Sequence, residues 1–157
     1  RWENGAIDVA AEHLATATLQ RALPFILFDP PPLPGHRGRA LVTASVNELH
    51  AVGAWLVANI LERDGWDVRL LGANTPVEDV LAMVRRYEPR FVGVSVALLQ
   101  HVAAAVELTE RLAALPDPPK VMLGGQLVLS VPELADRLKA DAVPRSLGEA
   151  LRVAAEW

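Results

Sequence analysis

Apolar residues follow two patterns along this chain: short continuous runs, and stripes at intervals of three and four. The runs predict buried strands at 39–44, 68–71, 91–95 and 120–123, and a short fifth strand at 142–143. The stripes predict helices at 51–64, 77–87, 102–115, 131–138 and 147–155. Strands that alternate with helices form a parallel sheet covered on both faces. We therefore expect residues 39–157 to form an α/β domain, a flavodoxin-like or Rossmann-like fold with a five-stranded parallel sheet.

The segment before this domain has only the helical pattern. From Ile7 to about Phe28, apolar residues recur at intervals that predict one long helix. One helix cannot bury its own apolar stripe, so residues 1–28 are expected to belong to a helical bundle. Residues 29–38 are rich in Pro and predict an extended, stiff linker. The start carries neither an initiator Met nor a signal-peptide pattern, so we expect a domain cut from a longer protein.

Composition narrows the function classes. The chain has 157 residues, 52% hydrophobic and 22% charged, which fits one folded domain and excludes a disordered tail. Charged residues or Pro interrupt every apolar run before the roughly 20 residues of a membrane span, so we expect a cytoplasmic protein without membrane contact. The absence of Cys excludes disulfides and thiolate chemistry. A net charge of -4 argues against a broad nucleic-acid surface.

A carboxylate and an imidazole lie two residues apart in the loop after the first predicted strand, as Glu48-Leu49-His50. Residues two apart in a loop project to the same side, so Glu48 is expected to reach a ring nitrogen of His50. A carboxylate on one nitrogen fixes the tautomer and leaves the other nitrogen for a metal. By itself, the pair does not separate a metal ligand from a loop histidine with an incidental neighbour.

The loops after the later strands carry small or hydroxyl residues: Gly72 after the second, Ser95 after the third, and Gly124-Gly125 after the fourth. In an open α/β sheet, ligands bind at the carboxyl ends of the strands, where these loops meet. Small residues there let a nucleotide or a long cofactor tail approach the backbone. Each feature also has a plain alternative: a turn at Gly72, a helix cap at Ser95 and a hinge at Gly124-Gly125.

Taken together and in this order, these motifs resemble the cobalamin-binding domain of methionine synthase, corrinoid methyl carriers and B12-dependent mutases. The resemblance covers nearly all of residues 39–157. It implies base-off cobalamin, with His50 as the lower axial ligand of cobalt and the nucleotide tail passing Ser95. Glu48 stands where the family commonly has Asp, and it is expected to orient His50. The residues implied to bind the cofactor in this domain are Glu48, Leu49, His50, Ala51, Val52, Gly53, Gly72, Asn74, Thr75, Pro76, Ser95, Val96, Leu98, Gly124 and Gly125.

A second resemblance lies in the first helix. Trp2, followed after nine residues by Glu12-His13, is similar to the signature in the helical cap of light-sensing, adenosylcobalamin-dependent MerR-type regulators. Those regulators also tend to have Glu before the axial His. The resemblance implies that residues 1–28 cap the upper cobalamin face. Glu3 departs from photoreceptors that have a His there for the upper cobalt position. The alternatives are that Trp2 packs a helix end and that Glu12 and His13 face solvent.

The sequence therefore predicts a non-enzymatic sensory module that holds adenosylcobalamin, with methylcobalamin and hydroxocobalamin as alternative forms. Its expected partners are an output domain or protein outside this segment, such as a DNA-binding domain, and further copies of itself in a homo-oligomer. The segment itself is expected to make no direct nucleic-acid contact. The alternative function is the corrinoid carrier domain of a methyltransferase system, which must expose the upper face to substrates.

Three further residues have open or structural interpretations. His101, which precedes the helix predicted at 102–115, is expected either to touch the corrin rim or tail or simply to begin that helix. Trp55 and Trp66 are expected to pack in the domain.

Overall fold

The computed structural model describes residues 8–27, 37–131 and 133–157. They belong to two compact units, residues 1–32 and residues 33–157. The first contains helix α1 (Val9–Leu27), which matches the predicted helix. Its amino end is capped by Asp8, whose Oδ1 accepts the Ala11 N–H at 2.7 Å. None of the described helices is long and apolar enough to cross a membrane.

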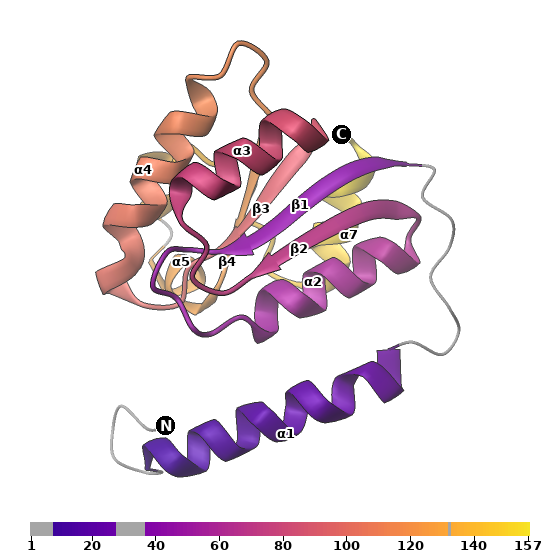
Figure 1. Cartoon of the computed structure of the whole chain (residues 1–157), viewed down its shortest axis with the longest axis vertical. Helices are drawn as coiled ribbons and strands as arrows, with labels where there is room; N and C mark the ends of the chain where they lie inside the picture. The colour runs from indigo at the N-terminus through magenta and orange to yellow at the C-terminus, as the bar shows by residue number, and fades with distance from the viewer. Residues whose placement is uncertain (1–7, 28–36, 132) are drawn as a thin grey trace. The chain divides into compact units, whose positions relative to one another are not determined.

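The second unit alternates strands and helices as the sequence predicts (Figure 1). Its elements are β1 (Gly38–Ala44), α2 (Val52–Arg63), β2 (Trp66–Gly72), α3 (Val77–Tyr87), β3 (Phe91–Ser95), the short 3-10 helix η1 (Leu99–His101), α4 (Val102–Ala113), β4 (Lys120–Gly124), α5 (Gln126–Ser130), α6 (Leu134–Arg137) and α7 (Leu147–Ala155). The roles of residues 1–28 as a cap and 29–38 as a linker stay predictions, and residues 28–36 lie outside the described part of the chain.

The sheet has four parallel strands in the order β2-β1-β3-β4, so the prediction of five strands is wrong. In place of a fifth strand, Ala142 makes a single parallel bridge to Met122. The Ala142 N–H donates to the Val121 carbonyl at 3.2 Å, and the Leu123 N–H donates to the Ala142 carbonyl at 2.9 Å. The next bond of such a ladder would need an amide proton at Pro144, which proline lacks. The ladder therefore stops after one bridge.

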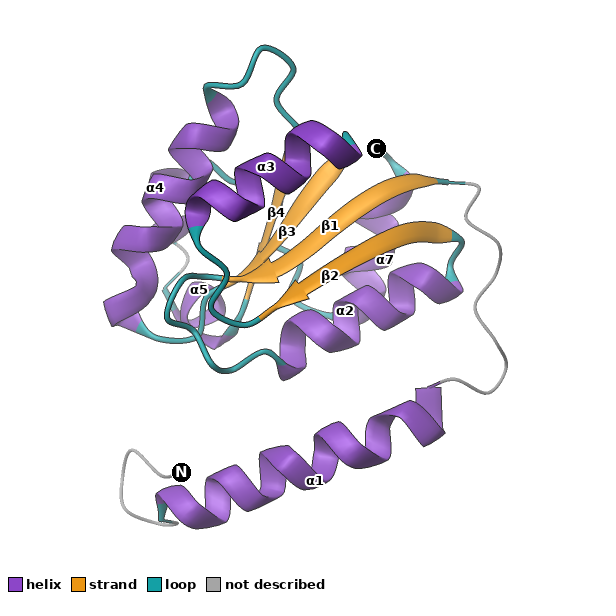
Figure 2. Cartoon of the chain, in the orientation of Figure 1, coloured by secondary structure: helices purple, strands orange, loops and turns teal. Residues whose placement is uncertain are grey.

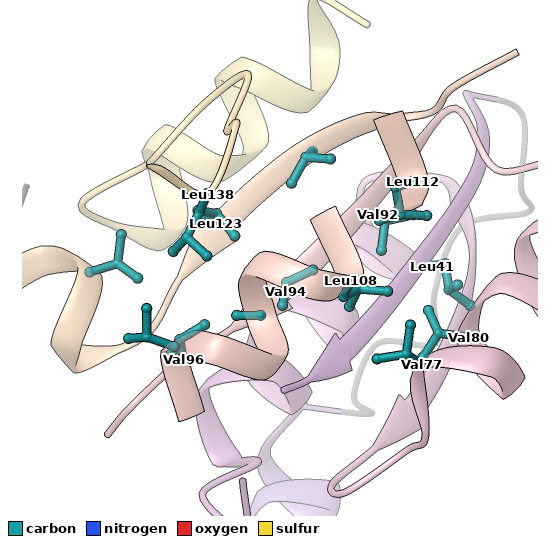
Figure 3. Packing of buried hydrophobic residues seen from close by; sticks show 14 of the residues in the cluster. Leu41, Val77, Val80, Val92, Val94, Val96, Leu108, Leu112, Leu123 and Leu138 are labelled. Atoms are coloured by element: carbon teal, nitrogen blue, oxygen red, sulfur yellow. The ribbon is translucent and has the colours of Figure 1, made fainter. Parts of the chain in front are cut away.

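Helices cover both faces of the sheet, with α3 and α4 on one and α2 and α7 on the other (Figure 2). Leu41, Val80, Val92 and Leu112 belong to the core under α3 and α4 (Figure 3). The second core contains Trp66, as predicted, in an edge-to-face contact with Phe91, while Trp55 is half-buried. Because both faces are covered, the strands are continuous apolar runs.

The helix predicted at 131–138 is replaced by two short helices, α5 and α6. Proline cannot continue a helix, and it disfavours helical backbone at the residue before it. Val131 precedes Pro132, and its backbone is extended, with φ -131° and ψ 80°. α5 starts earlier than predicted, directly after Gly125.

Gly125 connects β4 to α5 in a conformation that only glycine adopts easily. Its φ is 101°, and a Cβ there would lie 2.3 Å from the Val96 carbonyl oxygen. The Val96 N–H donates to the Gly124 carbonyl at 2.9 Å. The chain after β4 is therefore held close against the chain after β3, at the sheet edge where the candidate site lies.

Candidate functional site

Glu48 is the centre of the site and is fully buried at the carboxyl end of the sheet. Its Oε1 accepts the His50 N–H at 3.0 Å and lies 2.6 Å from Nδ1 of the same histidine. Its Oε2 accepts the Ala97 N–H at 2.9 Å and lies 2.9 Å from Nδ1 of His101. Both carboxylate oxygens are thus occupied by donors from the loops after β1 and β3.

These contacts keep Glu48 charged although it is buried. Burial raises its pKa, because desolvation disfavours the carboxylate. Hydrogen bonds lower it more, led by the His101 ring and followed by the His50 amide, the His50 ring and the Ala97 amide, so that its pKa is about 2. An ionised carboxylate only accepts hydrogen bonds, so Nδ1 must be the protonated nitrogen in both histidines.

His50 is thereby prepared as a ligand. Its side chain is 39% exposed, and Nδ1 is committed to Glu48. Nε2 has no hydrogen-bond partner within the described residues, and in this tautomer it carries a lone pair. A carboxylate that fixes the far nitrogen of a histidine is the usual support of a metal-binding imidazole. The prediction that Glu48 reaches the His50 ring is confirmed, with His50 Nε2 open to a metal.

His101 joins the site through a contact with Glu48 that the sequence did not predict. His101 is 5% exposed and precedes α4, which agrees with the prediction that it begins a helix. Neither that prediction nor the predicted contact with the corrin included the bond from His101 to Glu48. Its carbonyl also accepts the Ser45 hydroxyl at 3.2 Å. No local spacing links positions 48 and 101. The available signal was strand order, because β1 and β3 are neighbours and their following loops must meet.

The loop after β2 joins the same edge through an amide contact. Asn74 Oδ1 accepts the Asn47 N–H at 2.9 Å, and both asparagines have left-handed backbone, with φ 52° and 64°. Gly72 has φ 79° and forms a turn, which the sequence offered as the alternative interpretation of this residue. Thr75 donates to the Leu71 carbonyl at 3.5 Å, and Pro76 immediately precedes α3. This loop therefore lies next to the Glu48 loop.

A cavity of about 310 Å³ opens between the sheet and the helices α2 and α7. Of the predicted binding residues, Gly53, Ser95, Gly124 and Gly125 line it. Val96 does not, because its fully buried side chain packs in the core under α3 and α4. Among the other predicted residues, Leu49 is exposed. Ala51, Val52 and Leu98 are half-buried.

The family model of the B12 binding domain matches residues 38–155. This chain belongs to the B12-binding domain family. Cobalamin is thus the cofactor class of the domain, and the fold and the motif resemblance agree. The predicted flavodoxin-like strand order also holds for the strands that form.

Curated relatives of this B12-binding domain include regulators and corrinoid proteins. It is 32% identical over 139 residues to the HTH-type transcriptional repressor CarH of Myxococcus xanthus, covering 88% of the chain and 46% of the repressor. It is 26% identical over 116 residues to the trimethylamine corrinoid protein of Methanosarcina barkeri, covering 73% of the chain and 52% of that protein. The chain spans about half the length of these curated relatives.

Solved structures of similar fold include a cobalamin-binding protein and a corrinoid protein. A cobalamin-binding protein from Desulfitobacterium hafniense DCB-2 superposes with a TM-score of 0.72 and 24% identity, over 77% of this chain and 59% of that one. The monomethylamine corrinoid protein of Methanosarcina barkeri superposes with a TM-score of 0.70 and 25% identity, over 77% and 58%.

The residues present fit cobalamin. A metal held by one imidazole requires an accessible nitrogen with a lone pair, which His50 offers. A bulky tail requires room beside the strand ends. A Cβ added to Gly124 would meet no atom within 4 Å, so the cavity is open there.

The predicted cap residues lie in the first unit. Glu12 Oε2 is 2.6 Å from His13 Nδ1, and the Thr16 hydroxyl donates to Glu12 Oε1 at 2.7 Å. His13 is exposed and Glu12 is half-buried. Trp2 lies outside the described residues. The contact of these three residues with a cofactor stays a prediction.

Proposed function

We propose that this chain is a sensory module that holds adenosylcobalamin with His50 Nε2 as the lower axial ligand of cobalt. The observation that carries the cobalt ligand is the buried, charged Glu48 on His50 Nδ1, which fixes the tautomer that a metal needs, and the choice of a sensory module rests on the similarity to the Myxococcus repressor. In this role, Glu48 is a positioning residue.

The displaced nucleotide tail of the cofactor occupies the cavity between the sheet and helices α2 and α7. Support comes from the glycines that line the cavity, since any side chain at Gly53 or Gly124 would take up space there. The loops after β1, β2 and β3 form the exposed edge that would hold the corrin ring. The remaining predicted residues, Leu49, Ala51, Val52, Gly72, Asn74, Thr75, Pro76 and Leu98, belong to that edge, and Val96 contributes through its backbone alone.

Residues 1–28 form a cap over the upper face, with Trp2, Glu12 and His13 lining it. The sequence match to the Myxococcus repressor supports this assignment, because it covers 88% of the chain. Residues 38–157 are too few to supply that coverage, so the match includes part of the segment before them. When bound, adenosylcobalamin supplies a cobalt–carbon bond that light can break. The cap residues exclude water from the upper face, and their packing differs between the dark and the lit protein.

A change of cap packing needs an output, which we assign to a domain or partner protein outside this segment. The repressor relative is an HTH-type transcriptional repressor and is about twice as long as the matched region. A DNA-binding domain and a light-dependent homo-oligomer are therefore the proposed output. The segment described here makes no nucleic-acid contact of its own in this proposal.

The second candidate is a corrinoid carrier domain, favoured by the similarity to the trimethylamine corrinoid protein. A carrier presents the upper face of its cofactor to partner enzymes and does not itself catalyse the transfer. His50, Glu48 and the cavity have the same roles in both candidates. The cap separates them, because a buried adenosyl group has no use in a methyl carrier.

Absorption spectra test the proposal. The chain is purified in the dark, mixed with adenosylcobalamin, desalted and examined before and after green illumination. We expect a coloured protein whose spectrum and size-exclusion profile both change on illumination. A colourless protein after desalting would exclude cobalamin binding. A coloured protein that takes methylcobalamin equally well, with identical mass in the dark and in light, would favour the carrier.

A further inference from the structure

We infer that the cavity beside Ser95 selects cobamides by their lower base, taking an apolar aromatic base of the benzimidazole kind over a purine such as adenine. This inference rests on the proposed function, because it requires the nucleotide tail to leave the cobalt and enter the cavity. The inference concerns which nucleotide base the cavity accepts. Binding of cobalamin alone does not answer that question.

The floor of the cavity is one face of the sheet. Val42, Gly93 and Met122 are direct partners across β1, β3 and β4. Ser95 and Gly124 are partners in the next row on the same face, because side chains alternate along a strand with a period of two. The floor therefore presents an aliphatic side chain, a thioether, one hydroxyl and two glycines.

The facing wall is also apolar. It is formed by Ala54 and Val57 of α2 and Ala150 of α7, with Leu129 of α5 at one side. The backbone of β3 under the cavity is paired with β1 on one side and β4 on the other, so its amides and carbonyls are not available to a ligand.

Polar groups lie mainly at the rim. Gln126, Arg145 and Ser146 line the cavity, and all three are exposed. The Gln126 amide donates to Ser130 at 3.1 Å, and the Ser146 hydroxyl accepts the Glu149 N–H at 3.2 Å. Ser95, 8% exposed, is the buried polar side chain among the lining residues that the structure describes.

The cavity discriminates between lower bases by leaving the polar groups of one base without hydrogen-bond partners. Adenine carries an exocyclic amine and more ring nitrogens than benzimidazole, and one serine hydroxyl cannot satisfy them all. A polar group buried without a partner lowers affinity by about five- to 150-fold. A benzimidazole loses less hydration and fills the apolar walls. We therefore expect a preference of at least about tenfold for the benzimidazole cobamide.

Three corrinoids test the inference on the full chain in the dark: hydroxocobalamin, the cobamide with an adenine base, and cobinamide, which has no nucleotide. Dissociation constants come from equilibrium dialysis with the visible spectrum as readout. The expected order of affinity is hydroxocobalamin first, with both others at least about tenfold weaker. Equal affinity for hydroxocobalamin and the adenine cobamide would overturn the inference without needing any variant.

The substitution Gly124→Leu places a side chain into the cavity. Its Cβ would have no atom within 4 Å, and Gly124 is absent from the positive-φ glycines, so the fold accommodates it. Gly148→Leu is the matched control, since Gly148 has the same open surroundings but does not line the cavity. We expect Gly124→Leu to weaken hydroxocobalamin at least about tenfold while cobinamide stays within about twofold, and Gly148→Leu to change neither.

Failure of the inference and failure of the proposed function give different results. If all three corrinoids bind the wild-type chain with one affinity, the cobalt site stands and base selection is wrong. If Gly124→Leu leaves hydroxocobalamin binding intact, the tail does not use this cavity and the inference is wrong. If hydroxocobalamin, the adenine cobamide and cobinamide all leave the protein colourless, the proposed function fails, and base selection fails with it.

Discussion

Two glutamate–histidine pairs in this chain have the same contact distance and opposite surroundings. In both, a carboxylate oxygen lies 2.6 Å from Nδ1 of the histidine. In the first unit, the Glu12 side chain is 20% exposed and the His13 side chain 72%. In the second, the Glu48 side chain is 0% exposed and the His50 side chain 39%.

The difference shows that a short contact does not by itself make an oriented ligand. An exposed pair is screened by water and contributes roughly 0–1 kcal/mol, so its geometry is easily lost. Glu48 is buried and held by donors from His50, Ala97 and His101, which leave it one orientation. The fixed carboxylate then fixes the imidazole. The chemistry of the proposed cobalt ligand is thus set by the residues that hold Glu48 behind the histidine.

The largest contrast is expected from removing each histidine. His50→Ala deletes the proposed cobalt ligand, so affinity for hydroxocobalamin should fall by more than about 100-fold, beyond the 10- to 100-fold typical of losing a supporting residue. The spectrum of any residual complex should lack the histidine-bound signature. His13→Ala should keep that signature. A His50→Ala protein with the wild-type spectrum and affinity would exclude His50 as the ligand.

Acid should next remove the contribution of Glu48 to stability. The pKa of Glu48 in the folded protein is about 2, below its ordinary 4.5, so protonation is disfavoured in the native state. Its contribution, up to about 3 kcal/mol, is fully present above pH 4.5 and is lost as the pH falls toward 2.

Urea unfolding at about pH 6 and about pH 3 measures this loss. The difference in unfolding free energy between wild type and Glu48→Gln isolates the contribution of Glu48, because glutamine does not titrate. The difference in unfolding free energy should shrink on acidification, because protonation removes the charge that the native state stabilises. A Glu48→Gln difference that does not change with pH would contradict the charged state assigned to Glu48.

At neutral pH, Glu48→Gln should weaken cobalamin binding by about 10- to 100-fold, because the His50 tautomer is no longer imposed by an obligatory acceptor. Titration of each purified variant with hydroxocobalamin measures this. Glu12→Gln alters the exposed pair, whose contact fixes no cobalt ligand, so it should weaken the binding of hydroxocobalamin less than Glu48→Gln does. Equal losses in both variants would mean that burial of Glu48 is irrelevant to the site.

Much of this arrangement could be predicted from the sequence, for reasons that are local. Each strand and its following helix carry their own apolar spacing, so the order of elements and the Glu48–His50 contact follow from short stretches. The prediction of a fifth strand failed because Ala142-Val143 is apolar enough to suggest a strand, while the missing amide proton of Pro144 ends the ladder.

The rest depended on contacts between distant parts of the chain. His101 reaches Glu48 across 53 positions, and only the pairing of β1 with β3 brings the two together. The resemblance implied Val96 as a binding residue with the rest of the loop after β3, but it could not show that the Val96 side chain packs in the core under α3 and α4. Sequence proximity to a site therefore did not show where the Val96 side chain packs or which residue His101 contacts.

His101 gives the smallest expected effect and the sharpest test of how Glu48 is held. His101→Leu removes one donor from a buried carboxylate, so cobalamin affinity should fall by about tenfold and the free energy of unfolding by about 1–3 kcal/mol. His101→Gln can still donate to Glu48 and should recover most of the affinity. A merely structural role would predict that the two variants lose affinity in proportion to their lost stability. Hydroxocobalamin titration and urea unfolding of both proteins distinguish these outcomes, because the positioning role requires that the histidine-bound spectrum return with the donor.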